Sequence, residues 1–102
     1  MMKSFGDMMK QAQKVQKQMS ELQERLTEER YEATAGGGLV KAVVDGKQTL
    51  KEIKISPDVL KDNDVTLIED LVMTAIGEAQ RSSAEKMAAE YAKLTGGFKL
   101  PI

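Results

Sequence analysis

Apolar residues recur along the first part of the chain at alternating spacings of three and four residues. The repeat averages about 3.5 residues, which is the period of helices that pack along a partner helix. Its members are Phe5, Met8, Ala12, Val15, Met19, Leu22 and Leu26. We therefore predict a helix over residues 5–30, with one apolar seam and an opposite face that remains in solvent.

The middle of the chain, residues 31–55, has the pattern of an antiparallel sheet. The predicted strands are residues 31–35, 39–45 and 49–55. Three glycines, Gly36 to Gly38, separate the first two and supply the positive φ angles that a tight connection needs. Asp45-Gly46 is a favoured pair for a two-residue type I′ hairpin. The alternation falters around Leu50, which indicates a β-bulge.

A second long helix is predicted over residues 65–95. Ser56-Pro57-Asp58 before it is typical of a capping residue followed by proline at the first position of a short helical turn. Either Asp64 or Thr66 is the N-cap, and Thr66 has the capping-box spacing to Glu69. The helix's apolar positions are Ile68, Val72, Ala75, Ile76, Ala79, Met87, Tyr91 and Leu94. Gly96-Gly97 is expected to cap its end, and an apolar tail completes the segment 96–102. The predicted fold is α+β: a long helix, a three-stranded antiparallel meander, a short turn and a long helix.

Composition argues against an enzyme. The 102 residues include neither cysteine nor histidine, which removes thiolate nucleophiles and the usual zinc sites. Ser82 and Ser83 have no histidine to activate them. We expect no catalytic residues, cofactor, metal or small-molecule substrate. Residues 1–10 lack the apolar stretch of a signal peptide, and residues 67–79 are too short and too charged to cross a bilayer, so no membrane contact is expected either.

Two long helices with apolar seams and only four aromatic residues would leave much apolar surface uncovered in a monomer. A homo-oligomer, most simply a two-fold dimer, is therefore expected.

Charge is distributed unevenly although the net charge is only −1. If Phe5 is heptad position a, then Lys3, Lys10 and Lys17 all fall at position f, and Lys14 falls beside them at c. Such a row is commonly the solvated outer face of a helix. It is also a face that could meet several phosphates of a DNA duplex without reading bases.

Four motifs together resemble the YbaB/EbfC family. They are GGGLVKAVVDGK at residues 36–47, LKEIKISP at 50–57, MKQAQK at 9–14 and KLTGG at 93–97. The resemblance covers nearly the whole chain in the right order, as one domain over residues 1–102. It implies a bacterial nucleoid-associated protein of the cytoplasm that binds double-stranded DNA as a tweezer-like homodimer and alters DNA conformation and gene expression. The residues it implies for DNA contact are Lys10, Lys14 and Lys17, together with Lys3, Lys93 and Lys99.

Two other functions fit the same layout. Helix, hairpin and helix with a heptad seam is also the arrangement of prefoldin-like holdases, whose exposed apolar residues grip unfolded chains. A protein–protein adaptor without direct DNA contact is the third reading.

Overall fold

The computed structural model describes residues 4–96 of the chain. Its elements follow the predicted order of helix, meander, short helical turn and helix. They are α1 (Phe5–Glu28), β1 (Tyr31–Ala35), β2 (Val40–Val44), β3 (Leu50–Ile55), the 3-10 helix η1 (Pro57–Asp62) and α2 (Val65–Leu94). The predicted α+β fold is therefore confirmed, with α1 ending two residues earlier than expected.

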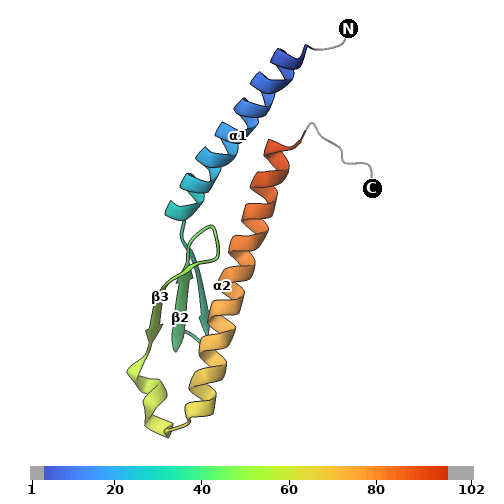
Figure 1. The fold of residues 1–102 in the computed structure, drawn as a ribbon. Coiled ribbons are helices and arrows are strands. Elements are labelled where there is room, and N and C mark those ends of the chain that lie inside the picture. Colours follow the sequence, from blue (N-terminus) through green and yellow to red (C-terminus); the bar gives the residue numbers. More distant parts are fainter. Residues whose placement is uncertain (1–3, 97–102) are drawn as a thin grey trace.

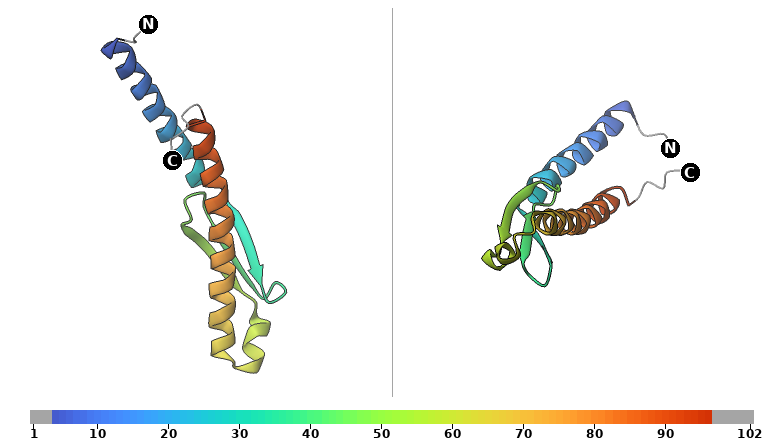
Figure 2. Two further views of the ribbon diagram at one scale, coloured as in Figure 1. Left: turned by 90° about the vertical axis from the view of Figure 1, so that its right-hand side faces the viewer. Right: turned by 90° about the horizontal axis from the view of Figure 1, so that it is seen from below.

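The molecule is a rod rather than a sphere, with extents of 72 × 28 × 16 Å. Figure 1 shows that α2 runs along most of this length, with its first half beside the sheet and its second half beside α1. The two long helices are antiparallel, so both ends of the described chain lie at the same end of the rod. The left view in Figure 2 shows α1 continuing past the end of α2.

The core lies between α2 and one face of the sheet. The strands are antiparallel in the order β1-β2-β3. Val40, Ala42 and Val44 of β2 pack against Ala75 and Ala79 of α2, and all five are fully buried. Alanine on both elements allows the helix to approach the sheet closely. The Gly36–Gly38 connection has positive φ angles of 65°, 69° and 97°, as predicted.

The turn between β2 and β3 differs from the prediction. A two-residue type I′ hairpin at Asp45-Gly46 is wrong, because β2 ends at Val44 and β3 begins only at Leu50. The positive φ falls at Gln48, at 65°, rather than at Gly46. The Asp45 carboxylate holds this longer loop by accepting hydrogen bonds from the backbone N–H groups of Lys47 (2.8 Å) and Thr49 (3.0 Å). We call residues 45–49 the hairpin loop.

The β-bulge predicted around Leu50 is present. Val43 pairs with Glu52 while Val44 pairs with Leu50, so Lys51 is the extra residue on β3. The bulge re-aims the Lys51 side chain, and its Nζ lies 3.9 Å from Oδ2 of Asp45.

The structure shows which of the predicted capping residues cap the helices. Asp64, not Thr66, caps α2, because its Oδ1 accepts a hydrogen bond of 3.0 Å from the backbone N–H of Leu67. Ser56 caps η1 as expected. At the far end the C-cap of α2 is Thr95 rather than glycine. The second expected capping glycine, Gly97, and the apolar tail lie outside the described residues.

Candidate nucleic-acid interface

The first part of α1 projects from the rest of the molecule, and we call residues 5–21 the α1 arm (Figure 1). The seam of α1 is buried only where α2 runs beside it, at Leu22 and Leu26. Toward the tip of the arm the cover is lost, and Phe5 and Met8 are 78% and 58% exposed. Among the described residues, α1 is therefore packed at its C-terminal end and exposed at its N-terminal end.

Three of the predicted lysines form a row on this arm. Lys10, Lys14 and Lys17 are all exposed, and helical geometry places them within about 60° of one another around the axis. Lys10 and Lys17 are separated by about 10 Å along the helix. We call these three residues the lysine row. The prediction that they share one outward face agrees with their exposure.

The charges of the row are only partly compensated. Lys17 Nζ lies 4.0 Å from Oε1 of Glu21, and both side chains are largely exposed, so the pair holds little free energy. Lys10 and Lys14 form no salt bridge with any residue between positions 4 and 96. Two cationic groups on the α1 arm are therefore unpaired among the described residues.

The other predicted contact residues lie elsewhere. Lys93 is in the last turn of α2, beside a groove of about 290 Å³ between α1 and α2. The lining of this groove also includes Gln18, Leu22 and Arg25. Lys93 is thus near the base of the α1 arm but on a different helix from the lysine row. Lys3 and Lys99 lie outside the described residues.

The sequence pattern did not predict the cluster of charged side chains that is centred on Glu90. Its carboxylate oxygens lie 3.0 Å from Lys86 Nζ, 3.8 Å from Lys93 Nζ and 3.2 Å from Arg25 Nη2. The hydrogen bond from Lys86, followed by the charges of Lys93 and Arg25, holds the pKa of Glu90 below its usual value against the opposing effect of desolvation. Three cations thus share one carboxylate in this cluster. The spacings of Lys86 and Lys93 around Glu90 were readable from the sequence, but the partner on α1 had no local signal.

Within the described range, residues 4–96, no three acidic, histidine or cysteine side chains gather where they could hold a metal ion. None of the helices in that range is long and apolar enough to cross a membrane.

The fold has a counterpart among solved structures. The crystal structure of an uncharacterized protein, HP0035, from Helicobacter pylori superposes with a TM-score of 0.84, covering 91% of this chain and 98% of that one. The two sequences are 18% identical, so this likeness concerns the fold alone.

Sequence comparison finds relatives of higher identity than this structure. A nucleoid-associated protein from Thermoanaerobacter pseudethanolicus is 46% identical over 98 residues, covering 96% of this chain and 88% of the relative. Nucleoid-associated proteins from Caldanaerobacter subterraneus and Clostridium kluyveri are 44% and 45% identical over 98 residues; these matches cover 96% of this chain and 88% and 86% of those proteins. The sequence pattern of the YbaB/EbfC DNA-binding family matches residues 2–98. This chain belongs to the YbaB/EbfC DNA-binding family.

Proposed function

We propose that this chain binds double-stranded DNA as a homodimer, mainly through phosphate contacts made by the lysine rows of two α1 arms, and that binding alters the conformation of the DNA in the bacterial nucleoid. The observation that carries the proposal is the pair of exposed amines at Lys10 and Lys14, which form no salt bridge with residues 4–96, on a projecting arm. Membership of a DNA-binding family and the names of the bacterial relatives support the same partner.

The need for a second copy follows from the shape and the uncovered apolar surface. The radius of gyration is 20.1 Å, whereas a compact domain of this length would have about 13 Å. Leu50, Ile53 and Ile55 of β3 pair with the buried Val44, Ala42 and Val40, so all three residues lie on the same face of the sheet as the core. We call them the β3 apolar patch.

The β3 apolar patch lies at the edge of the sheet, beyond the cover of α2. Ile53 and Ile55 remain 38% and 43% exposed although they are on the core face. A two-fold dimer brings the same surface of both subunits together, which would bury both patches in one step. The sheets then form the middle of the dimer and the two α1 arms project from it.

The mechanism is electrostatic. A duplex carries one phosphate charge per about 1.7 Å of its axis, so a row of amines can meet phosphates at several points without a defined sequence. The two uncompensated amines of each arm give four contacts in a dimer. Counterion release then predicts that log affinity falls with log salt with a slope of about −3.6.

The test is a fluorescence-anisotropy titration of random and mixed-sequence duplexes at several salt concentrations. The expected result is binding with little preference among sequences and the salt slope given above. Affinity that does not change with salt would refute the phosphate mechanism, and the absence of any binding at low salt would refute the proposed function.

A holdase is the second candidate, because Phe5, Met8 and Met9 at the tip of the α1 arm are exposed and apolar. Methionine-rich surfaces adapt to varied apolar partners. Suppression of aggregation of an unfolded client that persists in high salt, without any DNA binding, would favour this function over the first.

A further inference from the structure

The hairpin loop contacts the C-terminal end of α1 through a backbone hydrogen bond. The backbone N–H of Gly46 donates a hydrogen bond of 2.7 Å to the carbonyl oxygen of Leu26, in the last turns of α1. Leu26 has no exposed surface. Its carbonyl oxygen also accepts from the N–H of Glu29 at 3.2 Å, where the helix ends. The loop thus contacts the C-terminal end of α1, five residues beyond the α1 arm.

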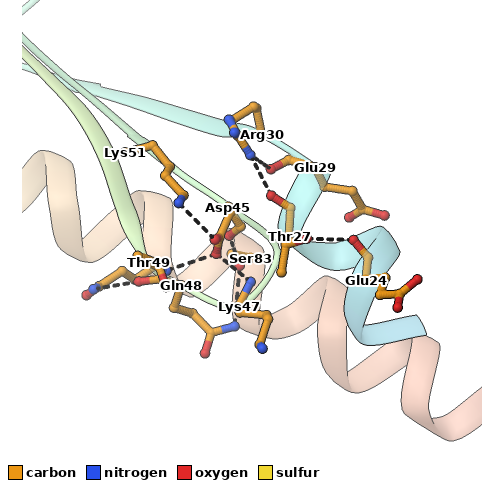
Figure 3. Close-up of polar contacts among 11 residues, drawn as sticks. Glu24, Thr27, Glu29, Arg30, Asp45, Lys47, Gln48, Thr49, Lys51 and Ser83 are labelled. Atoms are coloured by element: carbon orange, nitrogen blue, oxygen red, sulfur yellow. Dashed lines mark hydrogen bonds and ion pairs between the residues drawn. The ribbon is translucent and has the colours of Figure 1, made fainter. Parts of the chain in front are cut away.

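The hairpin loop is in turn fixed to α2 by side chains that have little exposure (Figure 3). The hydroxyl of the fully buried Ser83 donates a hydrogen bond of 2.7 Å to the carbonyl oxygen of Asp45. The amide of Gln80 donates to the carbonyl oxygen of Gln48 at 3.2 Å, and the amide of Gln48 donates to Ser83 Oγ at 3.3 Å. The loop therefore lies between the two long helices and contacts both.

Gly46 is the place in this loop where no side chain fits. A Cβ atom there would lie 2.6 Å from the carbonyl oxygen of Leu26 and 3.0 Å from its Cα. Both are backbone atoms, so the clash cannot be relieved by a rotamer change. It can be relieved only if α1 moves away from the loop or the loop moves away from α2. The φ of Gly46 is not in the left-handed region, so close approach, rather than backbone conformation, is the reason for glycine here.

A small change of the helix angle at the Gly46–Leu26 contact is amplified at the lysine row. Lys10 is sixteen residues before Leu26, which is about 24 Å along a helix. If α1 tilted by about 10° about Leu26, Lys10 would therefore move by about 4 Å. That displacement is more than twice the axial spacing of phosphate charges on a duplex, about 1.7 Å.

We propose that Gly46 is the positioning residue of the α1 arm: by letting the hairpin loop touch the backbone of α1, it sets the angle between α1 and α2 and so the register of the lysine row against DNA. This inference rests on the proposed function for its DNA consequence, but not for its structural one.

The angle can be measured directly because the chain contains no cysteine. Spin labels on Q13C of the α1 arm and A88C of α2, both at exposed positions, report the separation of the two helices by pulsed electron resonance. The labelled chain is diluted into an excess of unlabelled chain, so that only distances within one chain are seen. The variant is G46A, and the matched control is G77A on α2, where an added Cβ meets nothing within 4 Å.

We expect G46A to shift or broaden the distance distribution in the absence of DNA, while G77A leaves it unchanged. We further expect the salt slope of DNA binding by G46A to fall from about −3.6 to about −1.8, as half of the phosphate contacts are lost. An unchanged distance in folded G46A would overturn the proposal. So would a displaced arm with the affinity and salt slope of the parent protein.

If G46A does not fold, S83A carries the test. It removes the donor to the Asp45 carbonyl and should broaden the same distance distribution by loosening the loop from α2, whereas a sharp, unshifted distribution would overturn the proposal. Failure of the proposed function has a different signature, because the parent protein and G77A would then also fail to bind DNA.

Discussion

Arg25 of α1 and Glu90 of α2 form the ion pair that joins the two long helices, with Nη2 of the arginine 3.2 Å from Oε2 of the glutamate. The residues are 65 positions apart in the chain. Since Lys86 and Lys93 approach the other oxygen of Glu90, one carboxylate holds cations from both helices together. The base of the α1 arm is thus fixed electrostatically on one side and by the hairpin loop on the other.

The Glu90 cluster predicts a particular dependence of stability on pH. The pKa of Glu90 is lowered from its ordinary value of 4.5, first by the hydrogen bond from Lys86. A group with a depressed pKa contributes stability above its unfolded pKa and loses it as pH falls through the folded one. Parent protein should therefore lose more stability than E90Q when pH is lowered from 7 to 3, as measured by urea unfolding. The control is E85Q, an exposed position on the same helix, which should follow the parent curve.

The lysine row predicts a loss of DNA affinity that does not depend on sequence. K10Q/K14Q removes two of the three amines of each lysine row and should bring the salt slope from about −3.6 to well under half of that magnitude. The matched control is K54Q/K61Q, which removes the same charge from the opposite end of the rod, where both amines already pair with carboxylates. Circular dichroism should show both variants folded. Equal losses for the two variants would mean that net charge, not the row, drives binding.

Much of the fold could be predicted from local pattern. The helices and the glycine connection follow from periodicity and from the need for positive φ at Gly36 to Gly38, both of which are properties of neighbouring residues. The hairpin loop could not be predicted in the same way. Asp45-Gly46 has the composition of a type I′ turn, but Gly46 is used for its close approach to Leu26, which is twenty residues earlier in the chain. A tertiary contact thus replaced the local preference.

The candidate site also has one part that follows from local sequence and one part that depends on tertiary contacts. The lysine row was visible because its members share one helix, and their relative positions follow from helical geometry. The cluster around Glu90 includes Arg25 from another helix. The position of Arg25 depends on how α1 packs against the hairpin loop. The buried hydrogen bond from Ser83 to Asp45 had no counterpart in the sequence pattern either.

The β3 apolar patch predicts that a single charge disrupts self-association. I53D places a carboxylate on the core face of the edge strand, where a partner subunit would have to desolvate it, and should shift the protein from dimer to monomer in sedimentation velocity. K54D on the neighbouring residue puts the same carboxylate on the opposite face of the strand and should remain dimeric. A monomeric parent protein, or dimers in both variants, would contradict the assignment of this patch.

Tyr31 predicts a second pH effect, at the alkaline end. Burial, aided by its hydrogen bond to Glu29, raises the pKa of Tyr31 from 10.0 to about 12. A raised pKa favours the protonated form in the folded state, so the associated stability is complete below pH 10 and is lost as pH rises toward 12. Y31F should lack this component of the alkaline loss, and Y91F should retain it. Urea unfolding between pH 9 and 12 distinguishes them, and parallel curves for the parent protein and Y31F would contradict the prediction.

The Asp45 side chain predicts the stability of the hairpin loop. Its carboxylate is almost fully buried and accepts from the N–H groups of Lys47 and Thr49. D45A leaves both donors without a partner, and each such loss costs about 1–3 kcal/mol when the group is shielded from water. D45N keeps an amide oxygen in the same place and should lower the free energy of unfolding by much less. Denaturant unfolding at neutral pH measures both. Since the same loop contacts the C-terminal end of α1, D45A should also lower DNA affinity under conditions in which it is still folded. D45N should bind DNA like the parent protein.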